Sequence, residues 1–242
     1  MIPGVKRFIN IHNPNGKYLI EKTGILDIDR PLIIDVGANK GQTIDLFLSI
    51  NKKSEIFSFE PTPELVEYLI KKYEGYNNIH IVDIALSDEN GEANFYTSTF
   101  SATNSLLVPN VGTYNRINSD LGDILSKTDA RKCKVRTLDD WFINNITNNR
   151  IIDILKIDTQ GTEYNILSGS KSILHTNVKT VILEFQYIPF YFNSQPFYKT
   201  MELLYENGYY LFSFFESNKS SNMRLLENNA ILFNKYYFKE DF

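Results

Sequence analysis

Two carboxylates stand at the ends of two short apolar segments near the start of the chain. Asp35 ends the run Leu32–Asp35 and is followed by the turn residue Gly37, while Glu60 ends the alternating run Glu55–Glu60. A strand that leads through an acid and a glycine turn into a helix is typical of a nucleotide pocket, because the backbone approaches the ligand and the helix offers unpaired N–H groups. The two acids therefore predict a site for a nucleoside-bearing ligand.

The turn after Asp35 favours a ligand that carries an ammonium group. A dinucleotide fingerprint needs G-x-G-x-x-G, and Asn39 stands where its second glycine would be. A carboxylate at Asp35 repels a pyrophosphate and attracts an ammonium group. S-adenosylmethionine (SAM) has such a group and no phosphate, so the turn predicts SAM; an ordinary βα turn of another α/β protein is the alternative.

Glu60 follows Asp35 by about 25 residues, close to the spacing of a ribose-binding acid in a βαβ unit. At the end of a second strand its carboxylate is placed to accept both ribose hydroxyls. The alternative is an acid that stabilises the start of the helix after Pro61.

Further acids end the later strands. Asp158 follows the buried run Ile151–Ile157, and Glu184 follows Val178–Leu183. Ligands of open parallel sheets bind outside the carboxyl ends of the strands, and methyl transfer to an alcohol needs a base or a metal to take its proton. Asp158 is the first candidate for the base, or for orienting the acceptor, and Glu163 is the second. The alternatives are a helix cap at Asp158 and a solvated first-turn acid at Glu163.

A divalent metal is possible at these strand ends but is not predicted. Asp158 and Glu184 could hold Mg²⁺ with water in the remaining positions. No third oxygen ligand can be named, and His12, His80 and His175 have no ligand spacing.

Strands and helices alternate along the chain until a final pair of strands, Tyr209–Phe215 and Asn229–Phe233. This order predicts an α/β fold with a seven-stranded, mostly parallel sheet, helices on both faces and a C-terminal antiparallel hairpin. The arrangement is that of class I SAM-dependent methyltransferases, which are Rossmann-like. We expect residues 1–30 to form an N-terminal preamble with a hairpin around Asn13–Gly16, and residues 31–242 to form one domain with this arrangement.

Residues 100–130 are polar and irregular, and an insertion of this length within a compact domain is most often a functional loop. We expect it to cover the substrate. The flanking runs Glu92–Thr99 and Arg131–Arg136 alternate as accessory strands, and Thr137 is placed to cap a helix.

Composition limits the function classes. The chain has 242 residues, 43% of them hydrophobic, which is enough to form one full core. Its formal charge of −4 argues against a nucleic-acid partner. A single cysteine, the lack of an apolar leader and the lack of a membrane span favour a cytoplasmic protein. The oligomeric state is not indicated.

Five motifs in register carry a resemblance to the FkbM-type methyltransferases. They are Asp35-Val-Gly-Ala-Asn-Lys-Gly41, Phe59-Glu-Pro61, Ala85-Leu-Ser87 with Gly91, Thr137-Leu-Asp139, and Leu155-Lys-Ile-Asp158-Thr-Gln-Gly161-Thr-Glu163. The resemblance implies SAM-dependent O-methylation in a family that acts on sugars, glycolipids and polyketides. In the last motif the family commonly has Val-Glu where this chain has Thr159-Gln160. The Gln160 side chain can form hydrogen bonds but carries no charge, so we assign it no acid–base role.

With this resemblance the predicted site has two sets of residues. The catalytic candidates are Asp158, Glu163 and Glu184. The cofactor-binding candidates are Asp35, Gly37, Ala38, Asn39, Gly41, Gln42, Thr43, Glu60, Pro61, Ala85, Leu86 and Asp158. The expected acceptor is a glycan or another small molecule, and the aromatic segment Phe185–Phe192 either stacks on sugar rings or belongs to the core.

Two other functions are consistent with such a fold. An NAD(P)-dependent oxidoreductase of the short-chain type needs Tyr-x-x-x-Lys, which occurs at Tyr18–Lys22 and Tyr68–Lys72, both outside the expected place. A non-catalytic binding protein would also keep the fold, although Asp35, Glu60 and Asp158 argue against it.

Overall fold

The computed structural model describes residues 16–146, 150–221 and 223–238. Seven strands form one sheet in the order β3-β2-β1-β7-β8-β10-β9. Their bounds are β1 Leu32–Val36, β2 Glu55–Phe59, β3 Ile79–Val82, β7 Ile152–Ile157, β8 Val178–Gln186, β9 Tyr209–Lys219 and β10 Leu225–Asn234. Only β10 runs against its neighbours in this sheet, which confirms the predicted mostly parallel fold with its C-terminal hairpin.

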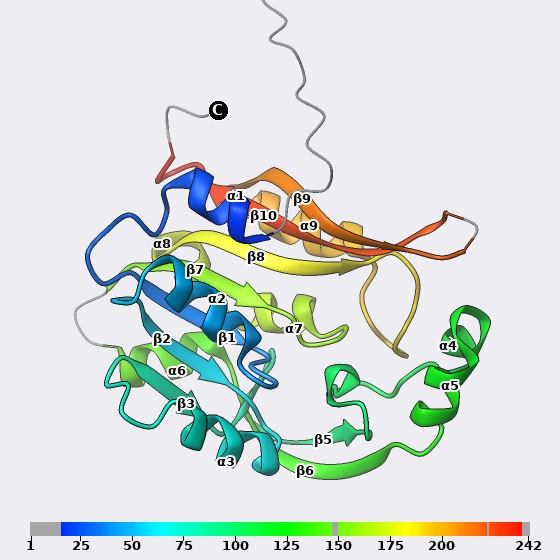
Figure 1. Ribbon diagram of the computed structural model, residues 1–242. Coiled ribbons are helices and arrows are strands. Elements are labelled where there is room, and N and C mark those ends of the chain that lie inside the picture. The colour runs from blue at the N-terminus through cyan, green and yellow to red at the C-terminus, as the bar shows by residue number, and fades with distance from the viewer. Residues whose placement is uncertain (1–15, 147–149, 222, 239–242) are drawn as a thin grey trace, which may run out of the picture.

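Helices cover both faces of this sheet (Figure 1). One face is covered by α1 Gly16–Thr23, α2 Gln42–Ile50 and α3 Pro63–Lys72, which pack on side chains such as Ile33, Ile154 and Ile231. The other face is covered by α6 Leu138–Asn145, α7 Glu163–Ser168, α8 Lys171–Thr176 and α9 Phe197–Glu206, which pack on side chains such as Ile34, Leu155 and Leu183. Central strands buried on both faces are rich in apolar residues along their whole length, which is why β1 and β7 could be found in the sequence despite the charged residues they contain.

A second, three-stranded sheet lies beside the main one. It has the order β4-β6-β5, from Ala85–Leu86, Asp129–Arg136 and Gly91–Thr97. The two predicted accessory strands are therefore confirmed, and they pair with each other. The predicted cap of α6 is also present, because the Thr137 hydroxyl accepts a hydrogen bond from the Asp140 backbone N–H.

The insertion at residues 100–130 is more regular than expected. It contains a 3₁₀ turn at Ser101–Thr103 and two helices, α4 Val111–Ile117 and α5 Ser119–Leu125. In Figure 1 these helices lie beyond the carboxyl ends of the main strands. They are held by a small apolar cluster in which Tyr114 and Leu125 pack with Phe190, Tyr191 and Leu226.

The N-terminal preamble also differs from the prediction. The hairpin around Asn13–Gly16 falls largely outside the described residues, and the residues that follow form helix α1 in place of a second hairpin strand. Leu19 and Ile20 of α1 are buried against the main sheet together with Phe215. Residues from 16 onward therefore belong to the core of the domain. Among the residues that the structure describes, no helix has the length and apolarity to cross a membrane.

Candidate active site

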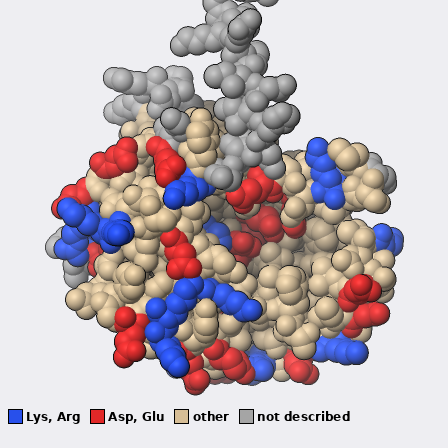
Figure 2. Space-filling model, in the orientation of Figure 1, with Lys and Arg blue, Asp and Glu red and all other residues tan. Residues whose placement is uncertain are grey.

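A cavity of about 560 Å³ opens at the carboxyl ends of the central strands. This volume is within the range of ligand pockets. Its walls come from the ends of β1, β2, β7, β8 and β10, from β4, and from the 100–130 insertion. Figure 2 shows acidic side chains gathered in a hollow near the middle of this face. Eight of the sequence-predicted site residues line the cavity: Gly37, Asn39, Glu60, Pro61, Ala85, Leu86, Asp158 and Glu184.

The turn after β1 forms one end of the cavity. Gly37 has φ 92°, and a Cβ atom at this position would stand 2.0 Å from the backbone carbonyl oxygen of Asp158. Only glycine therefore allows the turn to pack against the end of β7. The Gly37 and Ala38 N–H groups both donate to the Phe59 carbonyl, which ties the turn to β2.

Glu60 is held at the same end of the cavity with 4% of its surface exposed. Its Oε2 accepts from the Asn39 backbone N–H at 2.9 Å, and its Oε1 accepts from the Thr62 N–H at 3.0 Å. Burial raises the pKa of Glu60, while these hydrogen bonds oppose the rise. Each oxygen keeps a free lone pair, so the carboxylate can accept two more hydrogen bonds from a diol in the cavity.

An apolar wall stands next to Glu60. It is formed by Ala85, Leu86, Phe95 and Phe100, the last from the insertion. This combination of an apolar slot and a buried acceptor suits a planar base joined to a ribose.

Asp35 does not line the cavity, in contrast to the contact with a SAM ammonium group that we expected. Its side chain is fully buried, and its Oδ2 accepts from the Ser58 hydroxyl at 2.6 Å. Burial raises the pKa of Asp35, while the nearby Lys156 ammonium, 3.9 Å from Oδ1, opposes the rise. The cation beside Asp35 is thus one of the protein's own side chains.

Four other predicted cofactor residues do not line the cavity: Ala38, Gly41, Gln42 and Thr43. Gly41 has φ 80° and is the N-cap residue of α2, and a Cβ there would stand 2.4 Å from the Tyr73 hydroxyl. Gln42 accepts from the Lys40 backbone N–H.

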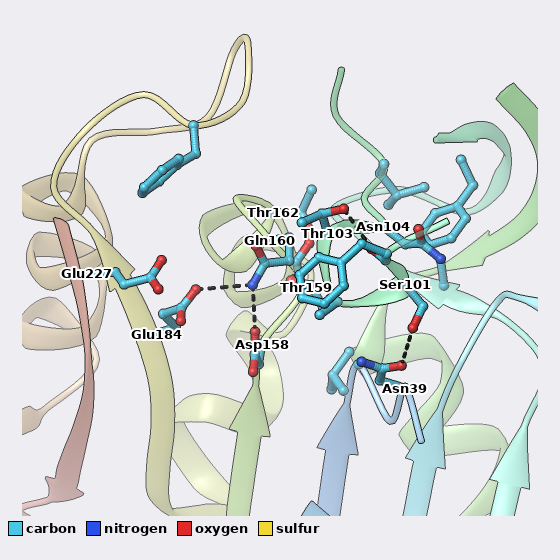
Figure 3. Close-up of a pocket in the computed structure, with 18 of the residues that line it drawn as sticks. Asn39, Ser101, Thr103, Asn104, Asp158, Thr159, Gln160, Thr162, Glu184 and Glu227 are labelled. Carbon is cyan, nitrogen blue, oxygen red and sulfur yellow. Dashed lines mark hydrogen bonds between the residues drawn. The ribbon is translucent and has the colours of Figure 1, made fainter. Parts of the chain in front are cut away.

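The part of the cavity that runs from Asp158, beside the Gly37 turn, to the ends of β8 and β10 is acidic (Figure 3). Gln160 donates from Nε2 to Asp158 Oδ1 at 3.1 Å and to Glu184 Oε2 at 3.2 Å, so one amide joins the ends of β7 and β8. Its Oε1 accepts from the Tyr191 hydroxyl at 3.2 Å. Glu227 of β10 lines the same end. Gln160 has φ 59°, a conformation that is costly for a side chain of this kind and is most often kept at functional sites.

Two carboxyl groups at this end have altered acidity. Burial raises the pKa of Glu184 well above its usual value, and the carboxylates of Asp158, Glu227 and Glu163 raise it further. Burial also raises the pKa of Glu227, and Asp158 adds to this, while a hydrogen bond from Asn218 opposes it. The raised pKa widens the pH range over which Glu184 is protonated, and in that form the side chain can donate a hydrogen bond.

Glu163, the second catalytic candidate, lies outside the cavity lining. Its carboxylate accepts from the backbone N–H groups of Thr159 at 2.9 Å and Gly161 at 3.0 Å. Only 7% of the residue is exposed. Glu163 therefore braces the loop that carries Gln160.

Lys156 was missed by the sequence reasoning. It is 9% exposed on β7, and its Nζ lies 3.2 Å from Asp158 Oδ2. The signal was present, because a lysine within an apolar strand, two residues before an acid, shares a face of the sheet with that acid.

Within the described ranges, no group of three or more His, Cys, Asp or Glu side chains is arranged to hold a metal ion. The two tyrosines of the dehydrogenase-like pattern lie elsewhere: Tyr18 on α1 and Tyr68 on α3 are both exposed and do not line the cavity.

Residues 35–211 match the family described as the methyltransferase FkbM domain. The chain belongs to the FkbM methyltransferase family. The 2-O-methyltransferase NoeI of Sinorhizobium fredii is 26% identical to this FkbM chain over 205 residues, which is 80% of each protein. The FkbM assignment makes the protein a SAM-dependent methyltransferase and argues against the oxidoreductase.

Solved structures resemble this FkbM protein more distantly. The fibrillarin of Aeropyrum pernix, solved with natively bound SAM, has a TM-score of 0.46 and 9% identity, over 84% of this chain and 66% of that one. The chain thus spans about two thirds of that fibrillarin. A putative rRNA methylase of Clostridium thermocellum has a TM-score of 0.47 and 9% identity, over 93% and 99% of the two chains.

Proposed function

We propose that this FkbM methyltransferase transfers a methyl group from SAM to a hydroxyl of a sugar unit, in a glycan or a related small metabolite. The observation that best supports this is one cavity lined both by Glu60, which follows β2, and by Asp158 and Glu184, which the Gln160 amide joins at the ends of β7 and β8. Related NoeI is named a 2-O-methyltransferase. Transfer to an oxygen also agrees with the position of the Asp158 carboxylate, which could take the proton that the acceptor hydroxyl loses.

The cofactor end would hold SAM without contact to Asp35. Glu60 has two free acceptor positions for the ribose hydroxyls, and Ala85 and Leu86 offer an apolar wall for the adenine. Asn39 also lines this end, and its side-chain oxygen accepts from the Ser101 hydroxyl at 2.9 Å. SAM supplies the activated methyl group.

Asp158 is the proposed proton acceptor. A hydroxyl has a far higher pKa than a carboxylate, so the carboxylate assists by taking the proton while the methyl group is being transferred. Gln160 fixes one oxygen of Asp158, and Glu184 in its protonated form can donate a hydrogen bond to a second oxygen of the acceptor. A polyol with neighbouring hydroxyl groups matches this arrangement.

The charge of the acceptor end favours an uncharged acceptor. The Asp158 carboxylate lines this part of the cavity, and a carboxylate at close range repels phosphate whether or not the neighbouring Glu184 is protonated. We therefore propose a neutral sugar as acceptor, in preference to a nucleotide sugar or an RNA.

The insertion at residues 100–130 is proposed to cover the bound acceptor. Thr103, Tyr114 and Leu121 line the cavity from this side. The segment is tied to the acceptor end in two ways. The Ser105 hydroxyl donates to the Gln160 carbonyl, and the Tyr191 hydroxyl shares its one hydrogen between the Thr103 carbonyl and Gln160 Oε1. Closing over the site would exclude water from the transfer step.

A SAM-consumption assay tests the proposal. The purified protein would be given neutral oligosaccharides, the same sugars as phosphates or nucleotide sugars, and RNA. We expect S-adenosylhomocysteine to form with a neutral sugar, and mass spectrometry to find one added methyl group on oxygen. Turnover with RNA or with the charged sugars only would contradict the proposed acceptor class.

A further inference from the structure

The most unusual side chain near the cavity is a buried lysine that does not line it. Lys156 sits on the central strand β7, and its register partner on β1 is Asp35. Its ammonium lies 3.2 Å from Asp158 Oδ2 and 3.9 Å from Asp35 Oδ1. The three side chains form a row from the base of the turn to the acceptor end of the cavity.

This row is not explained by folding stability. Ion pairs taken out of water seldom stabilise a protein more than apolar side chains of the same size, because desolvation offsets the attraction. Apolar side chains fill the neighbouring positions of the same strand, since Leu155 and Ile157 on either side of Lys156 are fully buried. Buried charges next to a cleft are more often kept for function.

Lys156 remains charged in this environment. Burial alone lowers the pKa of its ammonium, but the carboxylates of Asp158 and Asp35, with a smaller contribution from Glu184, raise it above the usual value. A permanent cation therefore faces one oxygen of Asp158.

Both carboxylate oxygens of Asp158 accept hydrogen bonds. Lys156 holds Oδ2, and the Gln160 amide holds Oδ1 at 3.1 Å (Figure 3). Gln160 is also in contact with Tyr191, whose hydroxyl shares its one hydrogen between Gln160 Oε1 at 3.2 Å and the Thr103 carbonyl at 2.9 Å. The two hydrogen bonds restrict rotation of the Asp158 side chain. Each carboxylate oxygen can accept a second hydrogen bond, so lone pairs remain free for a hydroxyl in the cavity.

We infer that Lys156 is a positioning residue for Asp158, and that Asp35 contributes to catalysis by holding Lys156 in place and not by contact with SAM. This inference rests on the proposed role of Asp158 as proton acceptor. The three residues act as one unit: β1 supplies the counter-charge, and β7 supplies both the cation and the base.

The test uses two variants that separate charge balance from catalysis. Lys156→Met keeps the side-chain length and leaves the two acids unpaired. The double variant Lys156→Met with Asp35→Asn removes one charge of each sign, so the net charge of the row is that of the natural protein. Lys179→Met is the matched control, because Lys179 pairs with Asp153 at 2.6 Å on the same sheet, at the opposite ends of β8 and β7.

We expect both Lys156 variants to lower kcat about ten- to a hundredfold, less than the about 10²–10⁴ that follows loss of a general base. Calorimetry should show unchanged affinity for S-adenosylhomocysteine. The double variant should regain the melting temperature that the single variant loses, without regaining kcat. Lys179→Met should lower the melting temperature and leave kcat unchanged.

Recovery of kcat in the double variant, or normal kcat in Lys156→Met, would overturn the inference, because Lys156 would then serve only to balance Asp35. A natural protein that transfers no methyl group to any hydroxyl compound would instead contradict the proposed function. The two failures are distinguishable, because the first is measured against an active natural protein.

Discussion

Replacement of Glu60 by glutamine should selectively weaken binding of the cofactor. Each oxygen of Glu60 accepts one backbone hydrogen bond, from Asn39 at 2.9 Å and from Thr62 at 3.0 Å. A glutamine amide can present oxygen to only one of these donors, so its NH₂ group faces the other N–H and also one of the ribose hydroxyls. Hydrogen bonds to charged groups contribute about 1.5–3 kcal/mol, and about 1.36 kcal/mol corresponds to a factor of ten. The affinity for S-adenosylhomocysteine should therefore fall about tenfold to a hundredfold.

Titration calorimetry at neutral pH measures this change directly. The control is Glu64→Gln, which makes the same substitution one turn later on an exposed side chain paired with Arg131. We expect the control to bind like the natural protein. Unchanged affinity in a folded Glu60→Gln variant would refute the assignment of Glu60 to the ribose.

Two further outcomes follow from the cavity. Hydrogen exchange in residues 100–130 should slow when S-adenosylhomocysteine and a neutral sugar are both bound, since Thr103 and Tyr114 line the cavity; equal exchange with and without ligands would argue against a covering role. Glu184→Gln should raise the melting temperature at neutral and alkaline pH. The pKa of Glu184 is higher in the folded protein than in the unfolded chain, so ionisation of this group destabilises the folded protein as the pH rises above the unfolded-state pKa near 4.5. Below that pH the difference should vanish, and a difference that persists in acid would show that charge is not its cause.

Strands buried on both faces were predictable because their pattern is local. Leu32–Val36 and Ile152–Ile157 are mainly apolar even though each contains charged residues, and strands of parallel sheets have this predominantly apolar composition. The acids that follow them mark the carboxyl edge of the sheet, so Glu60, Asp158 and Glu184 could be assigned to one site before the strand order was known.

Segments stabilised by distant partners were not predictable. The helix Gly16–Thr23 follows residues that read as a turn, and it is buried through contacts with Phe215 nearly two hundred residues later. The helices α4 and α5 have seven residues each, and their Asn110 and Asn118 caps look like loop residues in the sequence. Short helices of this kind form because tertiary contacts hold them, here with Phe190 and Leu226.

The same limit applies inside the site. The sequence shows that Asp35 and Lys156 exist, but it does not show that β1 and β7 are neighbours in a register that pairs these two residues. In this register the ammonium group nearest to Asp35 is that of Lys156. The expected partner of Asp35, the ammonium group of SAM, is therefore replaced by a side chain of the protein. Glu163 differs for a related reason, because the backbone turn of residues 159–161 folds onto its carboxylate.

The central claim is that Asp158 takes the acceptor proton and does not hold the cofactor. The most direct measurement is single-turnover methyl transfer by Asp158→Asn, with the affinity for S-adenosylhomocysteine determined on the same preparation. Loss of a general base predicts a rate lower by about 10²–10⁴, with cofactor affinity unchanged. A near-normal transfer rate, or a loss of affinity that accounts for the whole decrease, would contradict the account.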